Sequence, residues 1–154
     1  METALENVGL KGYEDKSPFT LSKGERQRVA VASVLAAQPQ VIILDEPTTG
    51  LDDSHQRSLM EMLKRLNRAG HTVLIITHSM DLAAGYATRT LVMKDGSIFL
   101  DGPTRLIFRK EAQLAEASLS PSPLVRLSNR LGTNGLTLQQ IVRELKLRPE
   151  KESK

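Results

Sequence analysis

The sequence predicts an α/β fold built on a parallel sheet. Two short apolar runs rich in β-branched residues, 41–44 and 72–77, have the continuous hydrophobicity of strands that are buried on both faces. Between them, residues 54–69 repeat apolar side chains at helical spacing. A strand, a helix and a second strand form a βαβ unit, whose crossover is right-handed in about 98% of cases. We therefore expect the two strands to be parallel and adjacent.

The residues before the first strand are expected to form two helices. Residues 2–10 predict a short amphipathic helix, and the polar stretch 11–20 predicts a loop. Residues 26–37 again carry apolar side chains at helical spacing, until Pro39 ends the pattern.

The residues after the second strand predict a hairpin followed by helices. Residues 89–100 contain two apolar runs joined at Asp95-Gly96, a favoured two-residue hairpin turn. Residues 103–108 have a helical pattern, and Ser122-Pro123 has the form of a helix start. We expect residues 151–154 to fray.

The last predicted helix begins at a capping box, in which Thr137 is followed three residues later by Gln140. Four residues at helical spacing make up its expected buried face: Leu138, Ile141, Val142 and Leu145.

The composition is that of an ordinary globular domain, with 40% hydrophobic and 25% charged residues in a chain of 154. Its apolar stretches are far shorter than the roughly 20 residues that cross a bilayer, and it shows no secretory leader. Since there is no Cys, disulfides and thiolate metal sites are excluded. This composition suits a reducing cytoplasm.

The basic excess lies entirely in the second part of the chain. Residues 1–101 hold 11 Lys and Arg against 13 Asp and Glu, a net charge of −2, whereas residues 102–154 hold 10 against 5, a net charge of +5. Phe108 is the one aromatic residue of this basic part, so it lacks the stacking surfaces of single-strand and RNA binders. We interpret the charge as a solvated helical face and expect no nucleic-acid partner.

Carboxylate and imidazole groups follow the two predicted strands. Asp45 and Glu46 come directly after the first strand, and His78 follows the second. Each has an ordinary structural explanation when taken alone, as a turn cap or a structural histidine. However, ligands of open α/β sheets bind outside the carboxyl ends of the strands. We therefore expect these three side chains to converge at one sheet edge.

Taken in order, these residues and their neighbours resemble the motifs of ABC ATPases. The resemblance consists of four motifs: the signature at residues 21–28 (LSKGERQR), the Walker B strand and catalytic Glu at 41–46, the D-loop at 50–52 and the switch His at 78. Lys23 stands where the usual signature has a second Gly, and Glu25 stands where it has Gln. Both variants are closest to the ATPases of energy-coupling-factor importers for cobalt and vitamins.

The resemblance implies an ABC ATPase domain of the P-loop NTPase type over residues 1–101 and a helical C-terminal extension over residues 102–154. It also implies ATP and Mg²⁺ as cofactors. The implied roles are catalytic for Glu46 and His78, cofactor-binding for Ser22, Gly24, Glu25 and Asp52, and Mg²⁺ ligation for Asp45.

In this family ATP lies between two subunits. The resemblance implies that Ser22 and Gly24 present a hydroxyl, backbone N–H groups and a helix N-terminus to the γ-phosphate held by the other subunit. Glu46 would polarise the attacking water as a general base, and His78 would sense the γ-phosphate. Asp52 would reach across the dimer and couple the two sites.

A phosphate-binding loop is missing from the sequence. Such a loop needs G-x-x-x-x-G-K-[ST], and no stretch of the 154 residues fits that pattern. We therefore expect an incomplete ABC sheet with roughly half of the domain absent, and no ATP hydrolysis by this chain alone. The missing neighbour of the second strand would leave an open sheet edge, which predicts low stability or self-association.

The expected function is that of a partial ATP-hydrolysing subunit of an ABC importer, coupling hydrolysis to transport of a metal ion or vitamin. Its partners would be a second ABC ATPase subunit, identical or different, and the transporter subunits in the membrane. Its location would be cytoplasmic, at the inner face of the cell membrane. The alternative is a non-enzymatic regulatory or assembly module that supplies a signature motif to a complete ATPase.

Overall fold

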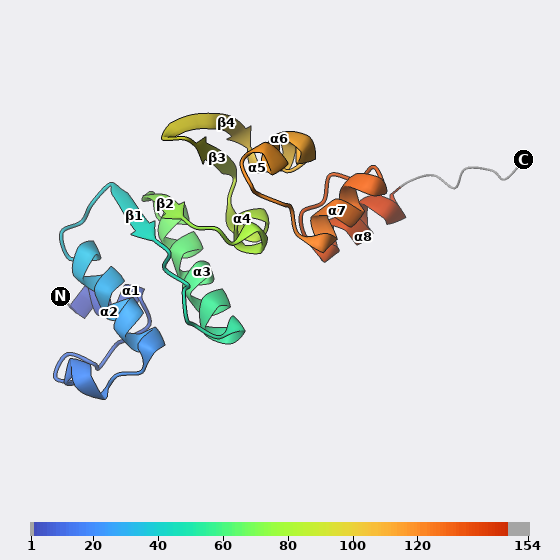
Figure 1. The fold of residues 1–154 in the computed structure, drawn as a ribbon. Helices are drawn as coiled ribbons and strands as arrows, with labels where there is room; N and C mark the ends of the chain where they lie inside the picture. Colours follow the sequence, from blue (N-terminus) through green and yellow to red (C-terminus); the bar gives the residue numbers. More distant parts are fainter. Residues whose placement is uncertain (1, 148–154) are drawn as a thin grey trace, which may run out of the picture. The chain divides into compact units, whose positions relative to one another are not determined.

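The computed structural model describes residues 2–147, which fall into two compact units divided after His78 (Figure 1). The predicted boundary between motif region and extension, at residues 101 and 102, stays a prediction. The predicted fraying of residues 151–154 lies outside the described residues. Over residues 2–147, none of the helices has both the length and the apolar character that a membrane crossing needs.

The first unit contains the elements that carry the motifs. In order they are α1 (Glu2–Asn7), the 3-10 turn η1 (Pro18–Thr20), α2 (Lys23–Leu35), β1 (Val41–Asp45), α3 (Asp53–Arg68) and β2 (Thr72–Ile76). The predicted helices and strands are confirmed. Helix α2 begins three residues earlier than predicted because Ser22 caps it. The apolar spacing from residue 26 onward carries no information about that polar first turn.

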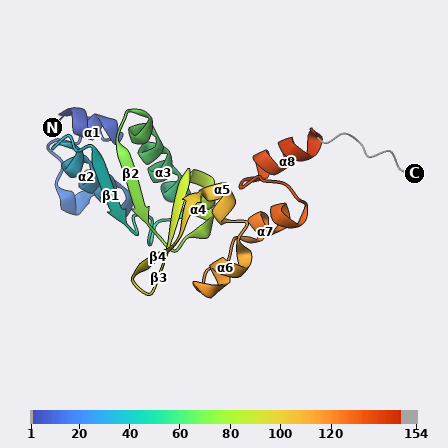
Figure 2. The same cartoon turned by 90° about the horizontal axis from the view of Figure 1, so that it is seen from above.

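Strands β1 and β2 pair in parallel, as the βαβ pattern predicts (Figure 2). Val41 lies opposite Thr72, and the register continues to Asp45 opposite Ile76. Helix α3, which connects them, contacts β2. The buried residues of this strand–helix–strand unit are Ile42 of β1 and Leu59, Met60, Met62, Leu63 and Leu66 of α3.

One face of this two-stranded sheet is exposed. Because side chains alternate along a strand and parallel partners share a face, Val41, Ile43, Leu74 and Ile76 lie on the same side. Ile43 is 63% exposed and Leu74 is 41% exposed, whereas Ile42 on the other side is 1% exposed. The prediction that 41–44 and 72–77 are buried on both faces is therefore wrong for the described residues. The apolar composition fits two covered faces, but the residues of this unit cover one.

The second unit begins with a short helix and a hairpin and continues with helices. Its elements are α4 (Met80–Tyr86), β3 (Arg89–Lys94), β4 (Ser97–Pro103), α5 (Thr104–Ile107), α6 (Glu111–Glu116), α7 (Pro123–Arg130) and α8 (Leu138–Lys146). The antiparallel hairpin is confirmed, and Asp95 and Gly96 both take the positive φ angles that its two-residue turn requires. Its core gathers Ala84, Val92, Leu100, Ile107, Phe108, Leu114 and Val125.

Helices α4 and α6 do not follow from the hydrophobic pattern. Helix α4 buries only Ala84 and α6 only Leu114, so neither has a repeated apolar face. Helix α4 is set instead by a local signal, since the Ser79 hydroxyl accepts a hydrogen bond from the backbone N–H of Leu82.

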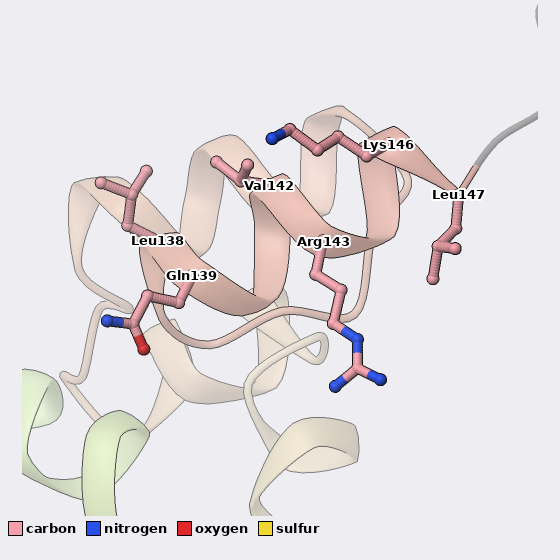
Figure 3. A pocket seen from close by; sticks show the side chains of 6 residues that line it. All are labelled: Leu138, Gln139, Val142, Arg143, Lys146 and Leu147. Atoms are coloured by element: carbon pink, nitrogen blue, oxygen red, sulfur yellow. The ribbon is translucent and has the colours of Figure 1, made fainter.

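The expected buried face of the last helix is wrong for three of its four residues. In α8, Ile141 is buried, but Leu138, Val142 and Leu145 are exposed. Leu138 and Val142 border an open hollow of about 510 Å³ that also includes Gln139, Arg143, Lys146 and Leu147 (Figure 3). The capping box is half formed, because Thr137 accepts from the Gln140 N–H while the Gln140 side chain accepts from Leu136.

Two neighbouring substitutions in β1 distinguish the covered from the exposed sheet face. We expect Ile42→Ala to lower the free energy of unfolding by about 2–5 kcal/mol, because it removes a fully buried side chain. We expect Ile43→Ala to change it by less than about 1 kcal/mol and to reduce self-association. Urea denaturation and sedimentation velocity measure the two effects. Equal destabilisation by both variants would contradict the one-sided burial.

Candidate functional site

Glu46 and His78 meet at the carboxyl edge of the parallel strand pair. Glu46 Oε1 accepts hydrogen bonds from the backbone N–H of His78 at 3.0 Å and from its Nδ1 at 2.6 Å. The Thr49 hydroxyl donates to Glu46 Oε2 at 3.2 Å. The hydrogen bond from the His78 side chain is the main cause that holds the pKa of Glu46 below its usual range. The expected convergence of these two residues, 32 positions apart in sequence, is confirmed.

The Glu46 backbone supports this arrangement in an uncommon conformation. Its φ angle is +45°, in the left-handed region that few residues other than glycine adopt. Its N–H donates to the carbonyl of Ile76 at 2.9 Å, so the turn out of β1 stays attached to β2. Such strained residues cost about 1–3 kcal/mol and cluster at functional sites.

Asp45, the last residue of β1, is exposed. Alternation places it on the exposed face of the sheet, opposite Ile76. Among the described residues, no group of three or more His, Asp or Glu side chains could hold a metal ion. One carboxylate suits Mg²⁺ in the form in which it keeps water ligands and binds substrate phosphates. The donor set therefore fits a phosphate-bound Mg²⁺ rather than a cage of protein ligands.

Ser22 and Glu25 form a complete capping box at the start of α2. The Ser22 hydroxyl accepts from the Glu25 N–H at 3.2 Å, and Glu25 Oε2 accepts from the Ser22 N–H at 2.8 Å. The other Glu25 oxygen accepts the Tyr13 hydroxyl proton at 2.8 Å. These bonds, the Ser22 N–H first, lower the pKa of Glu25 to about 2. Both oxygens of Glu25 thus hold the signature turn itself.

Gly24, which lies between Ser22 and Glu25 in the signature, is buried in the first turn of α2. A Cβ atom on Gly24 would lie 2.7 Å from Cδ2 of His55, so the imidazole would have to shift to admit a side chain there. This ring belongs to the first turn of α3, close to Asp52 in sequence.

Asp52 caps α3. Its Oδ1 accepts from the backbone N–H groups of Ser54 and His55, each at 2.9 Å, and from the Ser54 hydroxyl at 2.8 Å. Its Oδ2 lies 2.7 Å from His55 Nδ1. The His55 N–H is the main cause that holds the pKa of Asp52 well below its usual range. The role of Asp52 across a dimer stays a prediction.

The predicted residues thus form two groups within the first unit. Glu46 and His78 lie together at the sheet edge, whereas Ser22, Gly24 and Asp52 lie at the starts of α2 and α3. Sequence reasoning missed Tyr13 and His55, which hold the second group in place. Tyr13 gives no signal in the sequence, because it lies in a polar loop. His55 has one, since it stands three residues after a helix-capping Asp.

The ABC transporter family matches residues 1–49 of the chain. A Caldanaerobacter subterraneus protein named as an ABC transporter ATP-binding protein is 54% identical over 139 residues, which cover 90% of this chain and 24% of the relative. The energy-coupling factor transporter ATP-binding protein EcfA2 of Symbiobacterium thermophilum is 42% identical over 137 residues, which cover 88% of this chain and 48% of that protein.

Solved structures agree with these sequence matches. CbiO1 of Clostridium perfringens, described as part of the ABC transporter complex CbiONQ, aligns with a TM-score of 0.66 and 34% identity over 84% of this chain and 51% of its own. An ATP-binding cassette solved as a dimer with ADP and phosphate aligns with a TM-score of 0.56 and 34% identity, over 66% of this chain and 44% of its own. The fold is that of ABC ATPases, and the chain spans between about a quarter and a half of the length of these relatives.

The capping box makes a prediction about acid stability. The folded pKa of Glu25, about 2, lies below its ordinary value of 4.5, so its contribution is present above pH 4.5 and is lost as the pH falls toward 2. We expect Glu25→Gln to remove this part of the acid dependence, as measured by urea unfolding at a series of pH values. In Tyr13→Phe, which lacks one hydrogen bond to Glu25, the folded pKa of Glu25 rises toward 4.5, so the loss of stability should be smaller and should be complete at a higher pH. Identical acid profiles for all three proteins would contradict the role of Glu25.

Proposed function

We propose that this chain, which is similar to ABC transporter ATP-binding proteins close to the energy-coupling-factor type over part of their length, contributes to an ATP-hydrolysing site that powers an importer. It supplies the signature, the Walker B and switch residues and the D-loop to that site. The observation that carries the proposal is the Glu46–His78 contact across the parallel strand pair. This contact brings the Walker B motif and the switch His together at one edge of the sheet.

The start of α2 is the proposed phosphate-facing element. Ser22 caps a helix of 13 residues, whose N-terminal N–H groups and dipole favour an anion. Because Gly24 has no side chain, the backbone of the first turn can come close to a bound phosphate. We propose that Ser22 and Gly24 bind the γ-phosphate of an ATP held by a second ABC subunit. The two oxygens of Glu25 bind Tyr13 and Ser22, so its part in the site is to hold this turn.

Glu46 is the proposed general base. A base must be ionised to accept a proton, and the hydrogen bonds from His78 both orient the ionised Glu46 carboxylate and lower its pKa, so we propose that it acts on the water by its position. One oxygen faces His78, and the other has a single long contact with the Thr49 hydroxyl. We propose that this second oxygen orients the attacking water. His78 is hydrogen-bonded to Glu46, and we propose that it also contacts the γ-phosphate. The presence or absence of that phosphate would then affect the position of Glu46.

Mg²⁺ with ATP supplies the neutralisation of phosphate charge during transfer. The residue proposed to hold it is Asp45, directly or through water, at the end of β1. Glu46 is less suited, since its carboxylate is already engaged by His78 and Thr49.

The phosphate-binding loop must come from residues outside this sequence. The 154 residues contain no G-x-x-x-x-G-K-[ST] motif, and the described sheet leaves one apolar face open. Both observations support the proposal that the site forms only with a P-loop-bearing segment. By itself the chain should neither bind ATP tightly nor hydrolyse it.

The proposed cargo and partners follow the named relatives. One is an energy-coupling factor transporter ATP-binding protein, and another is part of the CbiONQ complex. We propose that the site drives uptake of a metal ion or a vitamin. It would act with a second ATPase subunit and with membrane subunits, at the cytoplasmic face of the cell membrane.

The general base is tested in a complex of this chain with a P-loop-bearing subunit of the energy-coupling-factor type. We expect Glu46→Gln to lower chain-dependent ATP hydrolysis by about 10²–10⁴-fold while ATP binding is retained, because the variant keeps the shape of the side chain and loses its basicity. Glu61→Gln, on the exposed surface of α3, is the matched control and should leave turnover unchanged.

The phosphate-facing role is tested by Ser22→Ala, with Ser33→Ala on the same helix as its control. The Ser22 variant should weaken ATP-dependent association with the partner subunit. Robust hydrolysis by the isolated chain with micromolar nucleotide affinity would overturn the dependence on an external P-loop. A chain that binds the partner and changes its turnover equally well with Glu46→Gln would instead be a non-enzymatic regulatory module.

A further inference from the structure

The imidazole of His55 joins the first turns of α2 and α3. Its Nδ1 lies 2.7 Å from Asp52 Oδ2. Its carbon edge faces Gly24, where a Cβ atom would lie 2.7 Å from Cδ2 and 3.4 Å from Cγ. One ring therefore contacts the signature backbone and the D-loop carboxylate at the same time.

We propose that His55 is a positioning residue that holds the signature turn and the D-loop of one subunit in a fixed relation. The proposal rests on the proposed function, in which Ser22, Gly24 and Asp52 act on ATP at a subunit interface. The ring sets how closely the Gly24 backbone approaches α3, and its N–H orients Asp52 Oδ2. A displacement of one motif is thereby passed to the other.

The two carboxylate oxygens of Asp52 have different partners, so the contact with His55 can be removed without loss of the helix cap. Oδ1 makes the cap, through the Ser54 and His55 backbone N–H groups and the Ser54 hydroxyl. Oδ2 makes the contact with the His55 ring. Removal of the ring leaves the cap of α3 intact and releases the orientation of Oδ2. A purely structural role would show in stability, whereas a positioning role shows in turnover.

Lys23 makes a second contact between the same two segments. Its Nζ lies beside Gly50, on the side where a Cβ atom would stand. Gly50 has a φ angle of +72° and lies just before the D-loop Asp52. The first turn of α2 thus approaches the start of α3 through Gly24 and the D-loop through Lys23.

Three substitutions at position 55 separate the ring from its hydrogen bond. His55→Asn keeps an N–H donor near the position of Nδ1 and loses the ring. His55→Phe keeps a ring over Gly24 and loses the donor, and His55→Ala loses both. Each is compared with the unaltered chain in the complex with the P-loop-bearing subunit, with kcat and the KM for ATP measured separately.

We expect His55→Ala to lower kcat by up to about 100-fold, with a smaller change in KM, because small misplacements of positioning groups have effects of that size. His55→Asn should recover the part that depends on Asp52, and His55→Phe the part that depends on Gly24. The thermal midpoint should change little in all three. An unchanged kcat in His55→Ala would overturn the proposal.

A double variant tests the contact without any reference to activity. Gly24→Ala should lower the thermal midpoint of the full chain, because the new methyl group meets the imidazole. In the His55→Ala background the same substitution should cost much less, since the obstacle is gone. Additive effects of the two substitutions on the thermal midpoint would also overturn the proposal.

The proposed function and the positioning role of His55 can be disproved separately. If the unaltered chain adds no turnover to the complex and Ser22→Ala has no effect, the proposed function is wrong, and the positioning role falls with it. If the unaltered chain supports turnover and Ser22→Ala abolishes it, but His55→Ala does not lower kcat, the proposed function stands and the positioning role is wrong.

Discussion

The parallel pairing of β1 with β2 is the constraint on which the candidate catalytic site depends. Parallel strands end at the same edge, so the residues that follow them meet although 32 positions separate them. The pairing continues one step beyond β1, where the Glu46 N–H bonds to Ile76. This bond fixes the backbone at a positive φ angle and directs the Glu46 carboxylate to His78.

Both faces of the β1–β2 sheet carry apolar side chains. Ile43 and Leu74 are as apolar as Ile42 and Val73, yet one face of the sheet is exposed over the described residues. Burial of an apolar side chain of this size is worth about 1.5–3 kcal/mol, so an uncovered face lowers stability and favours association. The exposed face thus fits the proposal that the site forms only with a P-loop-bearing segment, which would also cover these strands.

The elements that could be predicted from sequence are those with a clear local pattern. Helix α3 repeats apolar side chains over 16 residues, both parallel strands are continuous apolar runs, and the hairpin has its Asp95-Gly96 turn. Helices α4 and α6 each bury a single side chain, so neither has a repeated apolar face. The exposed face of α8 was mispredicted because amphipathic spacing shows which side chains share a face, but not whether another element covers that face. Tyr13 and His55 depend on tertiary contacts that no local spacing encodes.

The two departures from the usual signature pattern are best understood together. A carboxylate at position 25 places negative charge at a helix start that is proposed to receive phosphate, which alone would oppose binding. Lys23 adds one positive charge two residues away, so the net charge of the turn is the same as with Gly and Gln at these positions. Glu25 is also directed inward, since its oxygens bind Tyr13 and Ser22, whereas the Lys23 amine lies beside Gly50 near the D-loop. The exchange gives the signature turn a stronger capping box and an added contact to the D-loop, without a net cost in charge.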